Sequence, residues 1–197
     1  MSIKRLLVAN RGEIARRVFR TAKEMGIFTV AVYSDGDRDA PFVTDADLAI
    51  ALGGTTAAES YLDTEKILEA AKSTGADAVH PGYGFLSENA GFAQAVSDAG
   101  LTWIGPPPAA IAAMGDKLAA KETMVDAEVP TLPSIEVTDS IDIGAVGQEI
   151  GFPLLVKASA GGGGKGMRVV DNEADLEDAI SGAKREALGA FGNDTVF

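Results

Sequence analysis

Four consecutive glycines, Gly161–Gly164, lie between two lysines, Lys157 and Lys165. Glycine has no Cβ, so the amide groups of such a loop can converge on an anion, and its backbone can adopt conformations closed to other residues. The two ammonium groups add positive charge beside those amides. The chemistry that these residue types predict is the binding of a polyphosphate.

The exact order of residues in this loop distinguishes three kinds of phosphate-binding loop. A Walker A loop needs Ser or Thr after its lysine, whereas Gly166 follows Lys165 here. Gly161, Gly163 and Gly166 fit the spacing of a dinucleotide-binding turn, but such a turn leads into a helix, and residues 167–170 are strand-like. We therefore predict a strand–loop–strand hairpin that closes over nucleotide phosphates. The alternative is an ordinary flexible hairpin.

A second candidate segment is His80–Asn89, with the sequence HPGYGFLSEN. It follows a predicted parallel strand, and open α/β sheets bind ligands at the carboxyl ends of their strands. Gly82 and Gly84 permit close approach of a ligand, and Tyr83 could pack flat on an apolar ring. For His80, a hydrogen bond within the core is a simpler interpretation than catalysis.

Two weaker signals accompany these motifs. Residues 8–14 run from a predicted strand into a helix N-terminus, which can bind an anion, but Arg11 and Glu13 could equally form a local ion pair. Lys117 opens a helical segment, where its charge opposes the helix dipole. A phosphate contact would explain that position, and so would a solvated side chain.

The elements that must position these residues alternate between strand and helix patterns. Strands are predicted at residues 3–9, 29–33, 48–52, 76–80 and 102–104, and helices at 13–25, 65–72 and 88–99, with Asp63 and Ser87 as helix caps. This alternation implies parallel βαβ units in an open doubly wound sheet, so the fold class is α/β.

The pattern changes after Gly105, where three prolines interrupt the chain. We predict an N-terminal domain at residues 1–104, a helical linker at 105–130 and a small α+β domain at 131–197. The last domain is predicted to contain helices at 140–150 and 174–188 and strands at 154–158 and 167–170. Residues 194–197 resemble the start of a strand with no partner after it, so we expect the chain to be a fragment.

Composition excludes several classes of function. The 197 residues are 46% hydrophobic and 23% charged, as in an ordinary globular protein, and the formal net charge is −12. An acidic balance argues against a nucleic-acid or membrane-surface partner. The chain has no Cys and one His, so disulfides are impossible and a zinc site is not expected. We find no signal peptide or membrane span, and therefore expect a cytoplasmic protein.

Taken together, these motifs resemble the N-terminal part of biotin carboxylase, the ATP-grasp component of biotin-dependent carboxylases. The matching stretches are residues 8–15, 80–89, 105–106, 114–117 and 157–168. The resemblance implies a Rossmann-like pre-ATP-grasp domain followed by most of an ATP-grasp lid domain. Lys165 stands where other members of the family carry Arg, a change that the site should tolerate.

The resemblance also implies roles for individual residues. In the family, lysines contact the ATP phosphates, the glycine loop covers them and a methionine lies by the adenine. The residues so implicated are Lys117, Lys157, Gly162, Gly163, Gly164, Lys165, Gly166 and Met167 for ATP, Tyr83 and Gly84 for the biotin pocket, and Arg17, Arg20 and Glu24 for a homodimer surface.

The implied reaction uses MgATP and bicarbonate to form carboxyphosphate, which carboxylates biotin on a carrier protein or domain. A carboxyltransferase subunit then uses the carboxybiotin for acyl-CoA carboxylation. The family's magnesium ligands, general base and bicarbonate-binding arginine belong to a C-terminal domain that these residues do not include. The resemblance therefore implies no catalytic or metal-binding residue in this chain and no activity for it alone. Two alternatives stay open: another ATP-grasp ligase, such as a carbamoyl-phosphate synthetase, and a non-catalytic truncated dimerisation partner.

Overall fold

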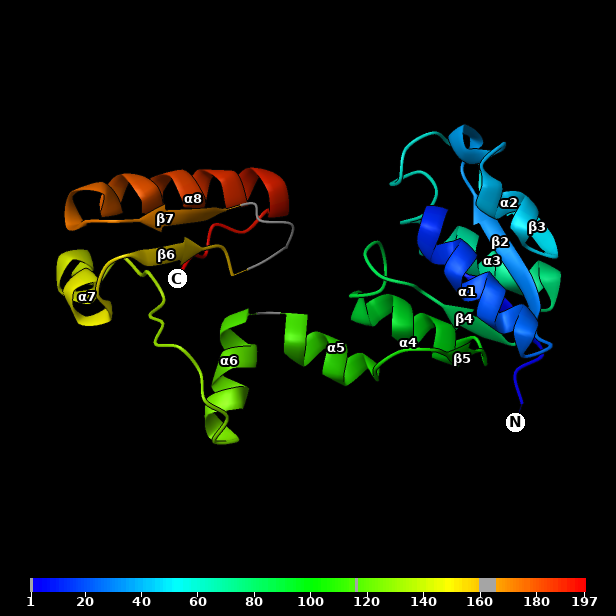
Figure 1. Ribbon diagram of the computed structural model, residues 1–197, viewed down its shortest axis with the longest axis horizontal. Coiled ribbons are helices and arrows are strands. Elements are labelled where there is room, and N and C mark those ends of the chain that lie inside the picture. The colour runs from blue at the N-terminus through cyan, green and yellow to red at the C-terminus, as the bar shows by residue number, and fades with distance from the viewer. Residues whose placement is uncertain (1, 116, 160–165) are drawn as a thin grey trace. The chain divides into compact units, whose positions relative to one another are not determined.

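The computed structural model describes residues 2–115, 117–159 and 166–197, apart from the side chain of Phe191. The chain divides into two compact units, Met1–Ala112 and Ala113–Phe197. Figure 1 shows the elements of each unit. The predicted domain boundaries at 104/105 and 130/131 stay predictions.

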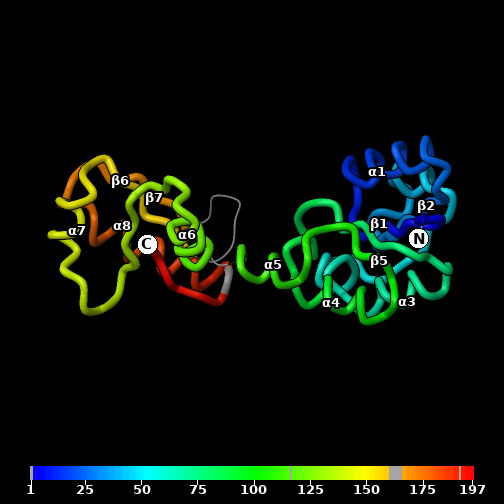
Figure 2. Tube along the Cα trace, turned by 90° about the horizontal axis from the view of Figure 1, so that it is seen from below, coloured from blue at the N-terminus to red at the C-terminus, as the bar shows by residue number. Residues whose placement is uncertain are grey.

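The first unit is built on five parallel strands in the order β3-β2-β1-β4-β5. The strands are β1 (Arg5–Val8), β2 (Phe28–Tyr33), β3 (Leu48–Ala51), β4 (Ala78–His80) and β5 (Thr102–Trp103), and the helices are α1 (Gly12–Glu24), α2 (Pro41–Asp45), α3 (Thr64–Thr74) and α4 (Ala90–Asp98). In Figure 2 the sheet lies between α1 and the pair α3 and α4. The predicted α/β fold with an open parallel sheet is confirmed.

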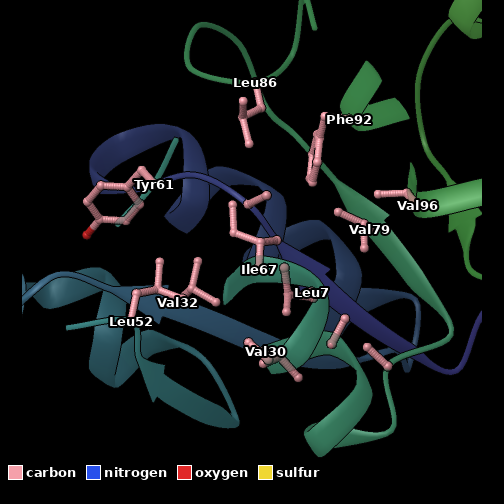
Figure 3. Packing of buried hydrophobic residues seen from close by; sticks show 14 residues of the cluster. Leu7, Val30, Val32, Leu52, Tyr61, Ile67, Val79, Leu86, Phe92 and Val96 are labelled. Atoms are coloured by element: carbon pink, nitrogen blue, oxygen red, sulfur yellow. The ribbon is translucent and has the colours of Figure 1, made fainter. Parts of the chain in front are cut away.

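Alternate residues of the central strand enter two separate cores. Leu6 and Val8 pack on the side of α1 and α2, where Phe19 and Phe42 are buried. Leu7 points to the opposite side, into the cluster that includes Val79, Ile67 and Phe92 (Figure 3). Because helices cover both faces, the strand can be apolar at consecutive positions, as it is from Leu6 to Val8.

Helix caps follow side-chain chemistry closely. Asp63 accepts a hydrogen bond from the Lys66 amide and caps α3, as predicted. The predicted Ser87 cap is wrong: Asn89 caps α4 by accepting from the Phe92 amide. The Ser87 amide instead donates to the Gly84 carbonyl, within the turn that precedes the helix. The sequence pattern did not predict α2 or the 3₁₀ turn at Asp35–Asp37.

The second unit contains a two-stranded antiparallel hairpin, β6 (Leu154–Lys157) and β7 (Met167–Val170). Its helices are α6 (Lys117–Asp126), α7 (Ile143–Ile150) and α8 (Leu176–Phe191), while α5 (Pro108–Gly115) spans the boundary between the units. The core forms between the hairpin and α8, from residues that include Val156, Val170 and Ile180.

The last residues pair with a segment that lies earlier in the chain. Val196 pairs antiparallel with Ala158 and is fully buried. The Lys157 and Phe197 backbones exchange two hydrogen bonds of 2.9 Å. The strand-like pattern at residues 194–197 thus corresponds to a single antiparallel bridge beside the end of β6, which was not predicted. Among the described residues, no helix is long and apolar enough to cross a membrane.

Candidate functional site

The glycine-rich segment connects two paired strands, as predicted. Lys157 and Met167 face each other across the hairpin, and the Ala158 amide donates to the Gly166 carbonyl at 3.0 Å. Gly166 has φ +68°, and a Cβ there would lie 2.8 Å from the Cβ of Ala158. Only glycine fits this position without a shift. The predicted phosphate-binding residues Gly162, Gly163, Gly164 and Lys165 lie outside the described residues.

One face of the hairpin is apolar and open. Cross-strand partners share a face of a sheet, so Leu155 and Val169 lie on the same face as Lys157 and Met167. Leu155, Met167 and Val169 are 41%, 44% and 69% exposed, whereas Val156, on the opposite face, is buried. An exposed apolar strip beside an ammonium group is suited to a ligand that combines a flat ring with anionic groups.

Lys117 reaches the same end of the hairpin from α6. Its ammonium donates to the carbonyl of Ser159 at 3.0 Å, two residues beyond Lys157. The structure therefore brings together three of the predicted ATP contacts, Lys117, Lys157 and Met167, although they span 50 positions of the sequence.

Phe197 belongs to the same region, and the sequence analysis did not identify it. The Lys157 ammonium lies 5.8 Å from the centre of the Phe197 ring, within range of a cation–π interaction. Lys157, Leu155 and Phe197 also line a cavity of about 460 Å³ beside β6. The only signal for Phe197 in the sequence was the strand-like pattern at residues 194–197.

In the first unit, the loop after β4 presents Tyr83 at the surface. Tyr83 is 64% exposed, and its hydroxyl donates to a carboxylate oxygen of Glu13 at 3.2 Å, which raises the pKa of Tyr83. Gly84 has φ +67°. The exposed ring and the open backbone beside it provide a surface on which a small ring can pack.

His80 closes the base of this loop. Its Nδ1 accepts a hydrogen bond from the Gly82 amide at 2.9 Å, and burial lowers its pKa. An accepting Nδ1 requires the neutral tautomer that carries its proton on Nε2. The predicted hydrogen bond of His80 is confirmed, and its structural role stays a prediction.

Arg11 does not pair with Glu13, the partner that the sequence suggested. It forms an ion pair with Asp37, which also accepts from the Tyr61 hydroxyl at 2.6 Å. The hydrogen bond from Arg11 is the main reason that the pKa of Asp37 is lowered. These side chains border a hollow of about 290 Å³ at the carboxyl ends of β1 and β2. The sequence analysis overlooked Asp37, which follows a strand by four residues.

The three residues predicted at a dimer surface are exposed on α1. Arg17, Arg20 and Glu24 are spaced by three and four residues, so they share one face of the helix. The buried residues of α1, which include Phe19, lie on its other side. Arg17 and Arg20 also border a shallow hollow of about 560 Å³.

No group of three or more His, Cys, Asp or Glu side chains that could hold a metal ion occurs in residues 2–115, 117–159 and 166–197. The prediction that magnesium ligands lie outside these residues stays a prediction.

Two family models together match nearly all of the chain. Residues 2–111 match the biotin carboxylase N-terminal domain, and residues 116–197 match the ATP-binding domain of the carbamoyl-phosphate synthase L chain. The first model alone covers more than half of the 197 residues.

Individual relatives give the same result. The chain is 50% identical over 198 residues to biotin carboxylase from Haemophilus influenzae, with 99% of this chain and 44% of that protein covered. It is 52% identical over 196 residues to the mitochondrial alpha subunit of methylcrotonoyl-CoA carboxylase from Arabidopsis thaliana, with 98% and 27% covered. The chain thus spans less than half the length of these relatives.

A solved structure shares the fold at 45% identity. It is the biotin carboxylase domain dimer of 2-oxoglutarate carboxylase from Hydrogenobacter thermophilus, in complex with MgADP, ADP and bicarbonate. The TM-score is 0.91, and the match covers all of this chain and 44% of that one. With the family model over residues 2–111, these similarities show that the chain belongs to the biotin carboxylase N-terminal domain family. Residues 116–197 form part of an ATP-grasp domain.

Proposed function

We propose that residues 1–197 form the nucleotide-binding part of an ATP-dependent ligase that carboxylates biotin with bicarbonate. The observation that carries this proposal is the convergence of Lys117 and Lys157 on one end of a hairpin whose face is open and apolar. Relatives that match the chain over 98–99% of its length are biotin-dependent carboxylases or their subunits.

Each part of the hairpin has a separate role in ATP binding under this proposal. The adenine ring packs on Leu155 and Met167, where it buries apolar surface that is otherwise exposed. The ammonium groups of Lys117 and Lys157 hold phosphate oxygens and offset their negative charge. The amides of Gly162–Gly166, together with Lys165, complete the phosphate site. The magnesium ion that neutralises the phosphates is held by residues outside these 197.

Biotin, carried on a separate protein or domain, packs against Tyr83 and Gly84 in this proposal. The exposed Tyr83 ring provides apolar surface, and Gly84 leaves room for close approach. The face of α1 with Arg17, Arg20 and Glu24 forms a homodimer contact, which is consistent with the similar Hydrogenobacter domain being a dimer. A carboxyltransferase subunit and a cytoplasmic location complete the proposal.

Another ATP-grasp ligase is the second candidate, because residues 116–197 match a carbamoyl-phosphate synthase ATP-binding domain. Residues 2–111 favour the biotin enzyme, since they match its N-terminal domain. The two candidates differ at Tyr83 and Gly84, which only the biotin enzyme would use to hold biotin. A biotin titration therefore separates them.

Calorimetric titration of the chain with ATP tests the nucleotide site. Replacing Lys157 by Gln removes a charged donor, and hydrogen bonds to charged groups contribute about 1.5–3 kcal/mol, so ATP affinity should fall about tenfold or more. Arg185→Gln removes the same charge from an exposed position on α8 and should leave the affinity unchanged. Equal affinities for the Lys157 variant and the wild type would contradict the site.

An activity assay tests the extent of the proposal. We propose that residues 1–197 alone bind nucleotide but do not carboxylate biotin, because they span only 27–44% of the relatives' chains. Incubation with ATP, Mg²⁺, labelled bicarbonate and free biotin should give no labelled carboxybiotin. Detectable product would show that these residues contain the complete machinery.

A further inference from the structure

Asn10 is a buried polar residue two positions after the end of β1, at the carboxyl edge of the sheet. It is 3% exposed, and its side chain connects two segments of the first unit. The Nδ2 group donates to the carbonyl of Pro81 at 2.7 Å and to the carbonyl of Tyr83 at 2.9 Å. The Oδ1 atom accepts from the amide of Arg11 at 2.9 Å.

These three bonds account for both donor hydrogens of the Asn10 amide and for one lone pair of its oxygen. Neither hydrogen remains to bind a ligand. Both donors of the side chain therefore act on the loop.

The loop that Asn10 holds has an unusual backbone. Gly82 and Gly84 have φ of +68° and +67°, and Phe85, which has a Cβ, has φ of +46°. The left-handed region is unfavourable for a residue with a Cβ, so contacts elsewhere must hold the loop in this conformation. Phe85 stacks on Tyr61 at 5.3 Å between ring centres, and Asn10 supplies two polar contacts beside the Gly82–His80 hydrogen bond.

The fit between Asn10 and Gly82 is close. A Cβ on Gly82 would lie 2.7 Å from Nδ2 of Asn10 and 3.0 Å from its Cγ. Because Gly82 has no side chain, the Asn10 side-chain amide can reach the carbonyls of Pro81 and Tyr83. Asn10 and Gly82 therefore pack closely together, next to the backbone of Tyr83.

We propose that Asn10 is a positioning residue that sets the conformation of residues 81–84 and thereby places Tyr83 and Gly84 for binding. This inference rests on the proposed biotin contact at those two residues. Asn10 holds the backbone on both sides of Gly82, so its loss releases the segment that presents Tyr83.

The decisive variant is Asn10→Asp, which keeps the size and the accepting oxygen but replaces the donor by a carboxylate oxygen. That oxygen then faces the carbonyls of Pro81 and Tyr83 and repels them. Asn89→Asp is the matched control: it introduces the same change nearby, at a helix cap where Asp serves as well as Asn. Asn10→Ala is the second variant, because it removes both bonds without adding charge.

Amide hydrogen exchange on the 197-residue chain measures the positioning role directly. The Gly82 and Ser87 amides are hydrogen-bonded within this region, to His80 and Gly84. In the Asn10 variants they should exchange at least tenfold faster, relative to core amides such as those of Val32 and Ile67. Asn89→Asp should leave that ratio unchanged. An unchanged ratio in both Asn10 variants would overturn the proposal, as would equal acceleration at every amide.

Titration with free biotin, followed through the Tyr83 and Gly84 amide shifts, separates this inference from the proposed function. The Asn10 variants should bind biotin at least fivefold more weakly and ATP equally well. Unchanged biotin affinity despite faster loop exchange would overturn a role in binding. If biotin does not shift these amides in the wild type, the proposed biotin contact fails, and the exchange ratio alone decides whether Asn10 positions the loop.

Discussion

The carboxyl edge of the first sheet and the open face of the β6–β7 hairpin are both places where a nucleotide could bind. The strand order β3-β2-β1-β4-β5 is that of dinucleotide-binding sheets, whose ligand occupies the crevice at the carboxyl ends of the strands. The hairpin has only two strands and no such crevice. By architecture alone, the first unit would be the better candidate.

The side chains reverse that expectation. At the sheet edge, Asp37 occupies the guanidinium of Arg11, and the Glu59 carboxylate accepts from the amides of Thr55 and Thr56 at 3.0 Å each. The protein's own carboxylates thus take donors that a phosphate would need. At the hairpin, apolar side chains stay exposed beside two lysines. A fold supplies a location for a ligand, but the side chains decide whether it is available.

The largest effect that we expect is a loss of stability when the Arg11–Asp37 pair at the sheet edge is removed. Asp37→Ala removes the acceptor for Arg11 and for the Tyr61 hydroxyl, and should lower the free energy of unfolding by about 2–3 kcal/mol in urea titrations. Asp45→Ala breaks the more exposed ion pair with Arg16 and should cost about 0–1 kcal/mol. ATP affinity should not change in either variant. Tighter ATP binding after loss of Asp37 would mean that the edge is a latent nucleotide site.

At the hairpin we expect a smaller effect, on ATP affinity and not on stability. Met167→Ala removes exposed apolar surface, so the free energy of unfolding should change by less than about 0.5 kcal/mol. ATP affinity should fall about fivefold, which corresponds to roughly 1 kcal/mol of lost apolar contact.

Leu188→Ala is the control for Met167→Ala, since Leu188 is 55% exposed on α8. It should change neither the free energy of unfolding nor the ATP affinity. If Met167→Ala lowers the free energy of unfolding but not the ATP affinity, this face has a structural role. The hairpin face and the sheet edge would then not differ in function.

The comparison also shows what could be predicted from sequence. The hairpin, the parallel sheet and the Asp63 cap could be predicted, because each depends on local patterns of apolar residues, glycines and capping side chains. The Arg11–Asp37 pair could not, because its partners are separated by 26 positions and meet only when β1 and β2 lie side by side. The Val196–Ala158 pairing could not be predicted for the same reason: a strand-like sequence indicates that a segment pairs with a neighbour, but not which neighbour.

The last effect that we predict is a pH dependence confined to the first unit. Burial lowers the pKa of His80 from its ordinary value of 6.5. Well above pH 6.5, His80 is neutral in both the folded and the unfolded chain, so it contributes no change of stability with pH. Below pH 6.5 the unfolded chain binds a proton that the folded chain rejects, so the free energy of unfolding falls until the pH reaches the lowered pKa. The slope is at most about 1.4 kcal/mol per pH unit.

Urea midpoints measured between pH 7.5 and 5.5 check this dependence, and His80→Asn isolates it. The Oδ1 atom of Asn can replace Nδ1 as the acceptor for the Gly82 amide, but it does not titrate, so the variant should lose the slope and keep most of its stability. The chain has a single His, so the second unit, if its unfolding is resolved separately, should give the same midpoint throughout this range. An equal slope in the variant would assign the pH dependence to another group. A shift in the second unit's midpoint would show that groups other than His80 contribute to the pH dependence.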